Sequence, residues 1–341
     1  MKKTILFATV LLLFASCSDK TEKKNVVCWG DSLTAPHDGN SLKSKISYFL
    51  HGGEFCYPYK LQKMLSKDYN VINAGVGGEN TLTIMARQGA YPMKLAHDVI
   101  ILPKDKRKYK MFIGNNDIPA FISSYNNSVV QPLLQRGYKK EKSSAFINEC
   151  YINNIPYTLS SESCYWRING EYQFEYNYYI NRLNDNNNTD TLKAGSVITT
   201  YAMNNLKNTY CNIFFIGQNG GFSDVADLLK QLQAMVAYSK CDKYIIISFH
   251  AVNKVLPTVD RLKDMEDSLS SVFGKHYLNL RLYMVNNGLN DAGITPTQTD
   301  KDSVNHGQVP PSLLADKVHF NKKGYELIAK QVYNKFKELK Y

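Results

Sequence analysis

Three residues whose types suit nucleophilic catalysis lie at opposite ends of the chain. Ser32 ends the motif Gly-Asp-Ser, directly after an apolar run at residues 26–28. Asp316 and His319 stand near the other end, with two residues between them. A serine hydroxyl is a weak nucleophile until a base takes its proton, and a histidine oriented by a carboxylate can be that base. The residue types therefore predict a nucleophile at Ser32, a general base at His319 and an orienting carboxylate at Asp316.

Two glycine-containing blocks could stabilise the negative charge that develops when such a serine attacks an acyl group. Gly78 closes a glycine-rich block at residues 75–78, and Asn219 lies in Gly-Gln-Asn-Gly at residues 217–220. Fixed N–H donors around the carbonyl oxygen can each lower the barrier by about 3 kcal/mol. The backbone N–H groups of Ser32 and Gly78 and the side-chain amide of Asn219 are the candidate donors. Taken singly, each of these residues is equally typical of a turn.

Together, the blocks resemble those of the SGNH (GDSL) hydrolase family. Gly-Asp-Ser-Leu, a glycine block, Gly-x-Asn and Asp-x-x-His follow one another here at residues 30–33, 75–78, 217–219 and 316–319. The resemblance implies ester hydrolysis through an acyl-enzyme, without a metal or other cofactor. It also implies a catalytic triad of Ser32, His319 and Asp316, and an oxyanion hole of Ser32, Gly78 and Asn219.

The third block departs from the pattern that is common in the family. Gly220 follows Asn219, where Gly-x-Asn-Asp would place an aspartate. The asparagine is kept, so the amide donor remains. Residues 114–117, Gly-Asn-Asn-Asp, match the Gly-x-Asn-Asp pattern more closely. Because they lead into strand-like sequence, we assign them to the inserted region and keep Asn219 as the oxyanion residue.

Strand-like and helix-like segments alternate on either side of a central region that has a different sequence pattern. Strands are expected at residues 25–29, 69–74, 212–216, 244–249 and 277–284, and helices at 60–66, 81–88, 223–238, 259–273 and 326–339, with a long loop at 286–314. This alternation predicts an α/β fold, a doubly wound parallel sheet flanked by helices, as the resemblance also implies. Ser32 would then lie at the carboxyl edge of the sheet, where open α/β sheets bind ligands.

The region between these two parts has the pattern of an all-β domain. Short apolar or alternating runs occur at residues 99–102, 110–113, 129–134, 145–147, 165–168 and 172–180, separated by turn signals. We therefore divide the chain into a hydrolase domain at residues 25–90 and 196–341 and an inserted β domain at 91–195. The insert is rich in tyrosine and contains Trp166. Its aromatic residues could stack on sugar rings, or pack inward as an ordinary β core.

The N-terminal segment is typical of an export signal. Two lysines precede an apolar stretch, and Phe-Ala-Ser-Cys at residues 14–17 resembles a lipobox. We expect residues 1–17 to form the signal, Cys17 to be lipidated, and residues 18–24 to form a tether. This predicts an exported lipoprotein anchored in the bacterial envelope through its N-terminal lipid. An ordinary signal peptide cleaved nearby is the alternative.

The net charge and the spacing of cysteines and histidines limit which partners and ligands the sequence suggests. The formal net charge is +11, which suits acidic glycans or anionic lipid as well as a merely solvated surface, and no nucleic-acid motif accompanies it. No cysteine or histidine spacing suggests zinc. Cys150 and Cys164 are close enough in sequence to form a disulfide in an exported protein. His37 and His250 flank expected strand ends, where they could line the cleft, but structural roles are the expectation.

The leading functional hypothesis is a serine esterase that removes an acetyl group from a carbohydrate. It depends on the family resemblance and on the expected compartment. The second hypothesis is a lipase, lysophospholipase or thioesterase. A glycan-binding surface lipoprotein with a vestigial hydrolase site is the third.

Overall fold

The computed structural model describes residues 22–35, 56–101, 111–133, 146–168, 171–183, 189–207 and 209–341, and at 163–168 and 171–174 it describes the backbone alone. The predicted signal segment, Cys17, most of the tether and His37 lie outside these ranges. Among the described residues, none of the helices combines the length and the apolar composition that a membrane span requires.

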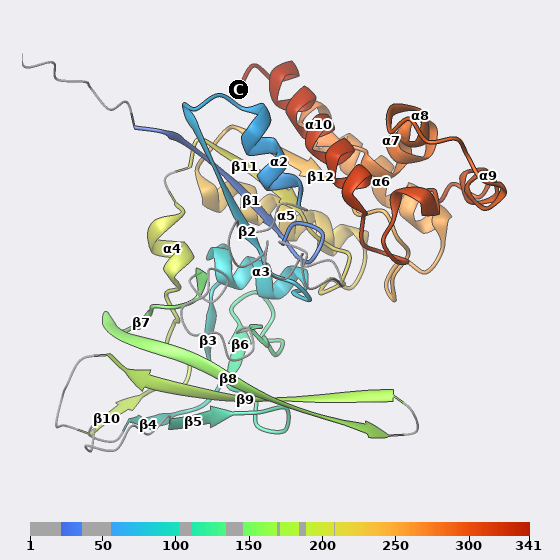
Figure 1. The fold of residues 1–341 in the computed structure, drawn as a ribbon. Helices are drawn as coiled ribbons and strands as arrows, with labels where there is room; N and C mark the ends of the chain where they lie inside the picture. Colours follow the sequence, from blue (N-terminus) through green and yellow to red (C-terminus); the bar gives the residue numbers. More distant parts are fainter. Residues whose placement is uncertain are drawn as a thin grey trace, which may run out of the picture.

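A mixed α/β part is built on a five-stranded parallel sheet (Figure 1). Its strands are β1 (Lys24–Gly30), β2 (Tyr69–Gly75), β11 (Cys211–Phe215), β12 (Tyr244–Ile247) and β13 (Tyr277–Leu278), in the spatial order β2-β1-β11-β12-β13. Every residue of β11 is buried, because helices cover both faces of the sheet. The chain moves outward in one direction from β1 to β2 and in the other from β11 to β13. The strand order therefore reverses beside β1, which is where open α/β sheets bind ligands.

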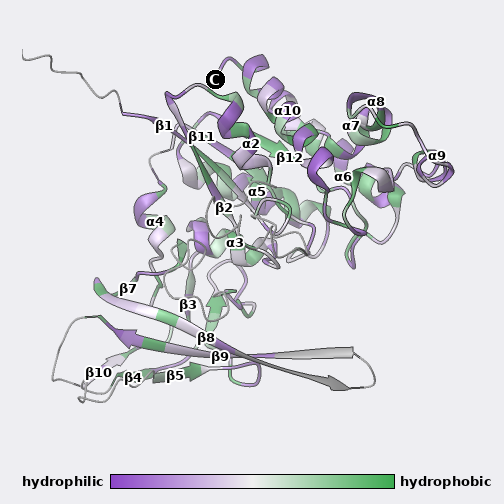
Figure 2. Cartoon of the chain, in the orientation of Figure 1, coloured by the Kyte–Doolittle hydropathy of each residue, from purple (hydrophilic) through white to green (hydrophobic). Residues whose placement is uncertain are grey.

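Two groups of helices cover this sheet on opposite faces (Figure 1). In one group, α2 (Tyr57–Met64) packs against α10 (Lys322–Glu338). In the other, α3 (Thr81–Gln88), α5 (Val225–Ser239) and α6 (Val259–Phe273) pack one against the next. Figure 2 shows hydrophobic colour on β12 inside the sheet and hydrophilic stretches along α10 outside it. The predicted helices at residues 81–88 and 259–273 are confirmed residue for residue.

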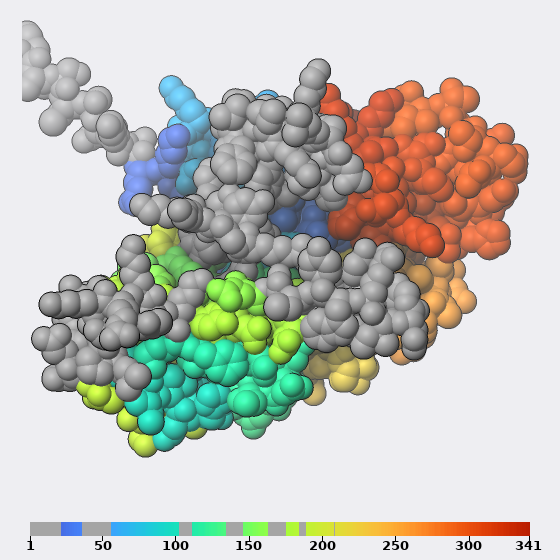
Figure 3. Space-filling model, turned by 60° about the horizontal axis from the view of Figure 1, so that its bottom comes forward, coloured from blue at the N-terminus to red at the C-terminus, as the bar shows by residue number. Residues whose placement is uncertain are grey.

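The strands between α3 and α4 (Tyr201–Asn205) pair antiparallel in three small sheets. They are β3 (Met93–Leu95), β4 (Val99–Ile101), β5 (Met111–Gly114), β6 (Phe121–Ser123), β7 (Cys150–Ile152), β8 (Ile155–Ile168), β9 (Glu171–Arg182) and β10 (Asp190–Leu192). A second apolar cluster joins these strands to Ala86 of α3. This β part, teal and green in Figure 3, lies beside the α/β part, whose C-terminal helices are orange and red.

Several predicted elements are wrong. The run at 277–284 predicted one strand, but the strand ends at Leu278, and α7 (Leu280–Asn286) follows. Asn279 starts this helix by accepting a hydrogen bond from Leu282 N at 3.0 Å. Helix formation turns Arg281 inward, where it pairs with buried Glu266 at 2.6 Å.

The predicted loop at residues 286–314 also contains helices. These are α8 (Gly288–Asp291) and α9 (Gln298–Asn305). Thr297 and Asp300 form reciprocal hydrogen bonds that cap α9, and this Thr-x-x-Asp signal was present in the sequence. In the β part, the described residues of the runs at 129–134 and 145–147 form no regular strand.

The expected disulfide between Cys150 and Cys164 is also wrong. Cys150 is a free, buried thiol and lies opposite Tyr157 at the start of β8. Cys164 lies opposite Glu175 much farther along the same strand. Seven residues of strand span about 23 Å, well beyond the roughly 7 Å that a disulfide permits between Cα atoms.

Candidate active site

The structure brings Ser32, His319 and Asp316 together in one hydrogen-bonded chain. His319 Nε2 lies 2.8 Å from Ser32 Oγ, and His319 Nδ1 lies 2.8 Å from Asp316 Oδ2. Since a carboxylate accepts, Nδ1–H donates to Asp316, and Nε2 is then placed to accept the serine proton. Ser32 follows β1 at the carboxyl edge of the sheet, beside the point where the strand order reverses.

A tight turn after β1 presents Ser32. Asp31 Oδ1 accepts a hydrogen bond from Leu33 N at 2.8 Å, and Asp31 O accepts one from Ala35 N at 2.8 Å. Gly30 is required here, because a Cβ at this position would lie 2.1 Å from Thr34 Oγ1 and 2.6 Å from a backbone oxygen of β11. Burial raises the pKa of Asp31 to about 7, opposed by the Leu33 N–H.

A second turn presents His319. Asp316 Oδ1 accepts hydrogen bonds from Val318 N and His319 N at 2.8 and 2.7 Å, while Oδ2 accepts from the imidazole. Partial burial opposes ionisation of Asp316, but these N–H donors outweigh it and lower its pKa to about 2. Asp316 is therefore a carboxylate at neutral pH, and it both shapes the turn and orients the histidine.

His250 supports this turn from the end of β12. Its side chain is buried, and Nε2 lies 2.7 Å from Val318 O. Burial lowers the pKa of His250 to about 4, so the ring is neutral near pH 7 and Nε2–H donates to Val318 O. The ring of His250 also lies 4.4 Å from that of Phe320, centroid to centroid. The structure thus gives His250 the supporting role expected for it from the sequence.

The glycine block and the Asn219 block meet beside Ser32. A Cβ at Gly77 would lie 3.8 Å from Ser32 Cβ, so this block passes next to the serine. Asn219 Nδ2 donates to Glu79 O at 3.0 Å, and Thr81 N donates to Gly220 O at 3.0 Å. Gly78 has a φ of +85°, in the left-handed region that favours glycine. The two blocks therefore hold each other next to the nucleophile.

The sequence reasoning missed a buried ion pair under the glycine block. Glu79 accepts hydrogen bonds from Arg87 Nε at 3.0 Å and Arg87 Nη2 at 2.8 Å, and both side chains are fully buried. Nη2 also donates to Ala74 O at 2.8 Å, at the end of β2. The guanidinium carbon lies 5.4 Å from the ring centroid of Trp29 and 5.6 Å from that of Phe146. No local spacing rule pairs residues 79 and 87.

The β part also reaches the candidate site. A Cβ at Gly78 would lie 2.9 Å from Leu133 Cδ1, so Leu133 covers the glycine block. Phe146 packs on Arg87, and Tyr125 Oη donates to Asp227 Oδ1 at 2.6 Å. None of these contacts was predictable from the sequence, because each joins segments that are far apart in the chain.

The closer letter match at residues 114–117 lies elsewhere. Gly114 ends β5, and Asn115 Oδ1 accepts hydrogen bonds from Asp117 N and Ile118 N. Its side-chain amide donates to Glu175 of β9. This block therefore closes a turn of the antiparallel sheet.

No family model matches the chain, and no curated protein matches it either. Among the described residues, no group of three or more histidine, cysteine or acidic side chains is arranged to hold a metal ion.

Proposed function

We propose that this protein is a serine esterase of the SGNH type, which hydrolyses carboxylic esters through an acyl-enzyme. The observation that carries the proposal is the pair of 2.8 Å contacts that link Ser32 Oγ to His319 and His319 to Asp316. These three residues come from two turns 287 positions apart, both at the carboxyl edge of the sheet. If Ser32 were only a turn residue, Asp316 only a cap and His319 only a surface residue, no hydrogen bond between the two turns would be expected.

In the proposed mechanism, His319 Nε2 accepts the Ser32 proton as Oγ bonds to the acyl carbon. The negative charge moves to the carbonyl oxygen, and Asp316 pairs with the new imidazolium. Nε2–H then protonates the leaving alcohol as the ester bond breaks. Water attacks the acyl-enzyme by the same route, giving up one proton to His319, which returns it to Ser32 as the acid leaves.

The proposed oxyanion hole consists of the N–H groups of Ser32 and Gly78 and the Asn219 amide. An amide nitrogen carries two hydrogens, and Asn219 Nδ2 uses one of them on Glu79 O. That bond fixes the orientation of the second hydrogen before a substrate arrives. Donors that are already oriented stabilise the charge without reorganising during the reaction.

We propose the following wider organisation. Residues 25–90 and 196–341 form the SGNH-type hydrolase domain, and residues 91–195 form a β domain inserted into it. The switch in strand order beside Ser32 and the separate apolar cluster of the β part support this division. The N-terminal signal with Cys17 makes the protein an exported, membrane-anchored lipoprotein, with an acylated glycan as the proposed substrate.

The test is hydrolysis of p-nitrophenyl acetate by the protein and by Ser32→Ala. We expect turnover that disappears in the variant while its circular dichroism spectrum is unchanged. Persistent turnover in Ser32→Ala would show that Ser32 is not the nucleophile. No turnover in either folded protein would contradict the esterase and support a glycan-binding protein with a vestigial site. A steep preference for long acyl chains would favour the hypothesis that the protein is a lipase.

A further inference from the structure

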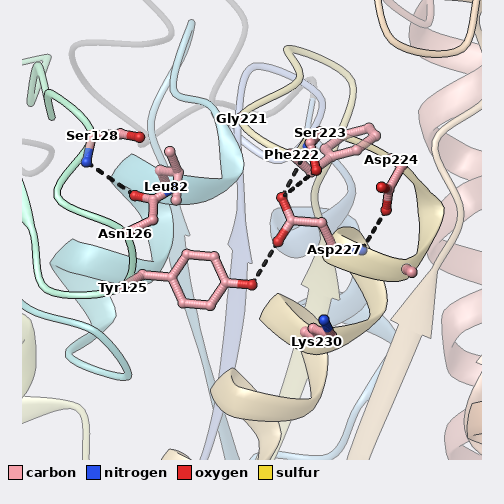
Figure 4. Close-up of a pocket in the computed structure, with 11 residues that line it drawn as sticks. Leu82, Tyr125, Asn126, Ser128, Gly221, Phe222, Ser223, Asp224, Asp227 and Lys230 are labelled. Atoms are coloured by element: carbon pink, nitrogen blue, oxygen red, sulfur yellow. Dashed lines mark hydrogen bonds between the residues drawn. The ribbon is translucent and has the colours of Figure 1, made fainter.

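A cleft of about 710 Å³ lies between the β part and the start of α5 (Figure 4). Its walls come from three segments: Leu82 on α3, residues 125–128 after β6, and residues 221–230 at the start of α5. This volume is in the range of small-molecule sites. We infer that this cleft binds the sugar portion of the ester substrate, an inference that rests on the proposed esterase function.

The walls of the cleft begin next to the two loops that would form the oxyanion hole, at Leu82 on α3 and at Gly221. Gly221 lies two residues after Asn219, a chain distance of at most about 7 Å. Gly221 lies against the start of α3, because a Cβ added to it would be 2.8 Å from Thr81 N. The next residue, Leu82, lines the cleft. Thr81 and Gly220 are joined by a backbone hydrogen bond of 3.0 Å. The cleft therefore begins within a few residues of Asn219, a proposed oxyanion donor, and the sugar of an ester held at Ser32 would reach it along these loops.

Polar and apolar groups both line the cleft, and hydrogen bonds hold its walls in place. Tyr125 Oη donates to Asp227 Oδ1 at 2.6 Å and joins the β part to α5 across the cleft (Figure 4). Asp227 Oδ2 accepts from Ser223 N at 2.9 Å. On the other side, Asn126 Oδ1 accepts from Ser128 N at 3.1 Å. Walls that are already organised lose little conformational entropy when a ligand binds.

The lining favours an uncharged ligand with many hydroxyl groups. The cleft lining includes exposed donors and acceptors at Asp224, Asn126, Ser128 and Lys230, and sugar hydroxyls can both donate to and accept from such groups. Leu82 and Phe222 supply apolar surface for the C–H face of a sugar ring. A fatty acyl chain would displace water from these exposed polar groups without replacing its hydrogen bonds, at a cost in free energy.

The local charge also argues against a phospholipid. Asp224 and Asp227 place two carboxylates in the cleft against one ammonium group, from Lys230. The cleft is thus locally acidic in a chain whose formal net charge is +11. Like charges repel, so a phosphate-bearing headgroup would be disfavoured in this cleft.

The test fills the cleft with a bulky side chain and compares two esters. Ala226 lines the cleft on the exposed side of α5, and Ala237 is exposed on the same helix but outside the cleft. Ala226→Trp and Ala237→Trp form a matched pair. The substrates are p-nitrophenyl acetate, which has no sugar, and a methyl glucoside carrying a single O-acetyl group.

We expect Ala226→Trp to lower kcat/KM for the acetylated glucoside at least about tenfold, through KM, because it removes productive binding. The loss for the acetylated glucoside should exceed any change for p-nitrophenyl acetate at least about fivefold, and Ala237→Trp should change neither substrate. Equal effects of the two variants on the glucoside would overturn the inference while leaving the esterase intact. Selective loss of long-chain esters in Ala226→Trp would assign the cleft to the acyl chain, which also overturns it.

A binding measurement separates this inference from the proposed function. Ser32→Ala is titrated with the acetylated glucoside in a calorimeter, alone and combined with Ala226→Trp. Binding that is lost only in the double variant supports the sugar site even if the parent protein hydrolyses nothing. Equal binding by the two, or no binding by either, contradicts the site, whatever the activity with p-nitrophenyl acetate.

Discussion

At the scale of single residues, Asp316 has two separable roles. One oxygen accepts the N–H groups that shape the turn, and the other accepts Nδ1–H of His319. An asparagine at 316 could keep the first role through its carbonyl oxygen. It would lose the negative charge that stabilises the imidazolium and selects the tautomer.

We therefore expect Asp316→Asn to keep the fold and to lower kcat for p-nitrophenyl acetate by about 10³–10⁴-fold. Steady-state kinetics at pH 7 measure this effect, and thermal unfolding provides the control for folding. An activity close to that of the parent protein would mean that Asp316 only shapes the turn.

His250 makes stability depend on pH in a direction that can be stated. Its pKa is about 4 in the folded protein and near 6.5 when unfolded, because burial disfavours the charged ring. The unfolded chain therefore binds the proton first as pH falls, and stability that is present above pH 6.5 is lost towards pH 4. Between pH 7 and pH 5, His250 should remove about 2 kcal/mol from the free energy of unfolding.

Urea unfolding at pH 7 and pH 5 measures this loss. His250→Gln keeps an N–H donor for Val318 O but has no ring to protonate, so its loss of stability over the same interval should be smaller. A variant with the same pH dependence as the parent protein would assign the acid sensitivity to other groups.

Leu133 lies against the glycine block, so it is placed to limit the space beside the proposed oxyanion hole. We expect Leu133→Ala to raise kcat/KM for p-nitrophenyl butyrate relative to p-nitrophenyl acetate by about threefold to tenfold, because the removed side chain leaves room for a longer acyl group. Competition between the two esters measures the ratio. A ratio that does not change would place Leu133 outside the path of the acyl chain.

At the scale of elements, the turn from β2 to α3 carries the site and α3 supports it. Glu79 sits in this turn, its carbonyl holds Asn219, and its carboxylate is held by Arg87 of α3. The first turn of α3 is capped by Asn80, whose side chain accepts from Thr83 N at 3.0 Å. One short helix thereby sets the positions of both loops beside Ser32.

Removing one partner of the buried pair should be costly, because the other charge is left buried without compensation. We expect Arg87→Met to lower the free energy of unfolding by about 3–5 kcal/mol. The double variant Glu79→Gln with Arg87→Met should recover part of this loss in stability. Its kcat should stay below that of the parent protein if the pair positions the oxyanion donors.

Urea denaturation and p-nitrophenyl acetate kinetics of the two variants and the parent protein measure these effects. A double variant with full activity would show that the pair serves stability alone. An Arg87→Met variant as stable as the parent protein would contradict the expected cost of the buried charge.

At the scale of the whole molecule, the β part and the α/β part build the candidate substrate region together. Tyr125 and Asp227, which are 102 residues apart, join the two parts across the cleft. The apolar cluster of the β part includes Ala86 of α3, the helix that follows the glycine block. The β part therefore supports the site as well as lining it.

The proposed anchor makes a prediction at the same scale. In cells that make the full chain, Cys17→Ala should move the protein from the membrane fraction to the soluble fraction, because the lipid is the proposed attachment. Cell fractionation followed by immunoblotting measures this, with Ser18→Ala as the matched control. Retention of the Cys17→Ala protein in the membrane fraction would contradict lipidation at this residue.

Local patterns in the sequence were sufficient for much of the fold. The predicted bounds of α3 and α6 are right to the residue, and apolar runs placed β1, β2, β11 and β12 within a few residues. The prediction failed at residues 277–284, where a single strand was expected. There Asn279 begins a helix, and a buried pair between Arg281 and Glu266 stabilises it. Glu266 lies too far from Arg281 along the chain for local sequence patterns to predict this pair.

The sequence by itself determined the residue types of the candidate site, because nucleophile, base, carboxylate and donor amide are each recognisable from short motifs. Only the tertiary structure decided that Ser32, His319 and Asp316 meet, that Glu79 and Arg87 pair, and that Leu133 covers Gly78. The physical reason is that each of these contacts depends on strand order and packing. Side chains far apart in the chain become neighbours only when β1, β11 and the helices around them take their places.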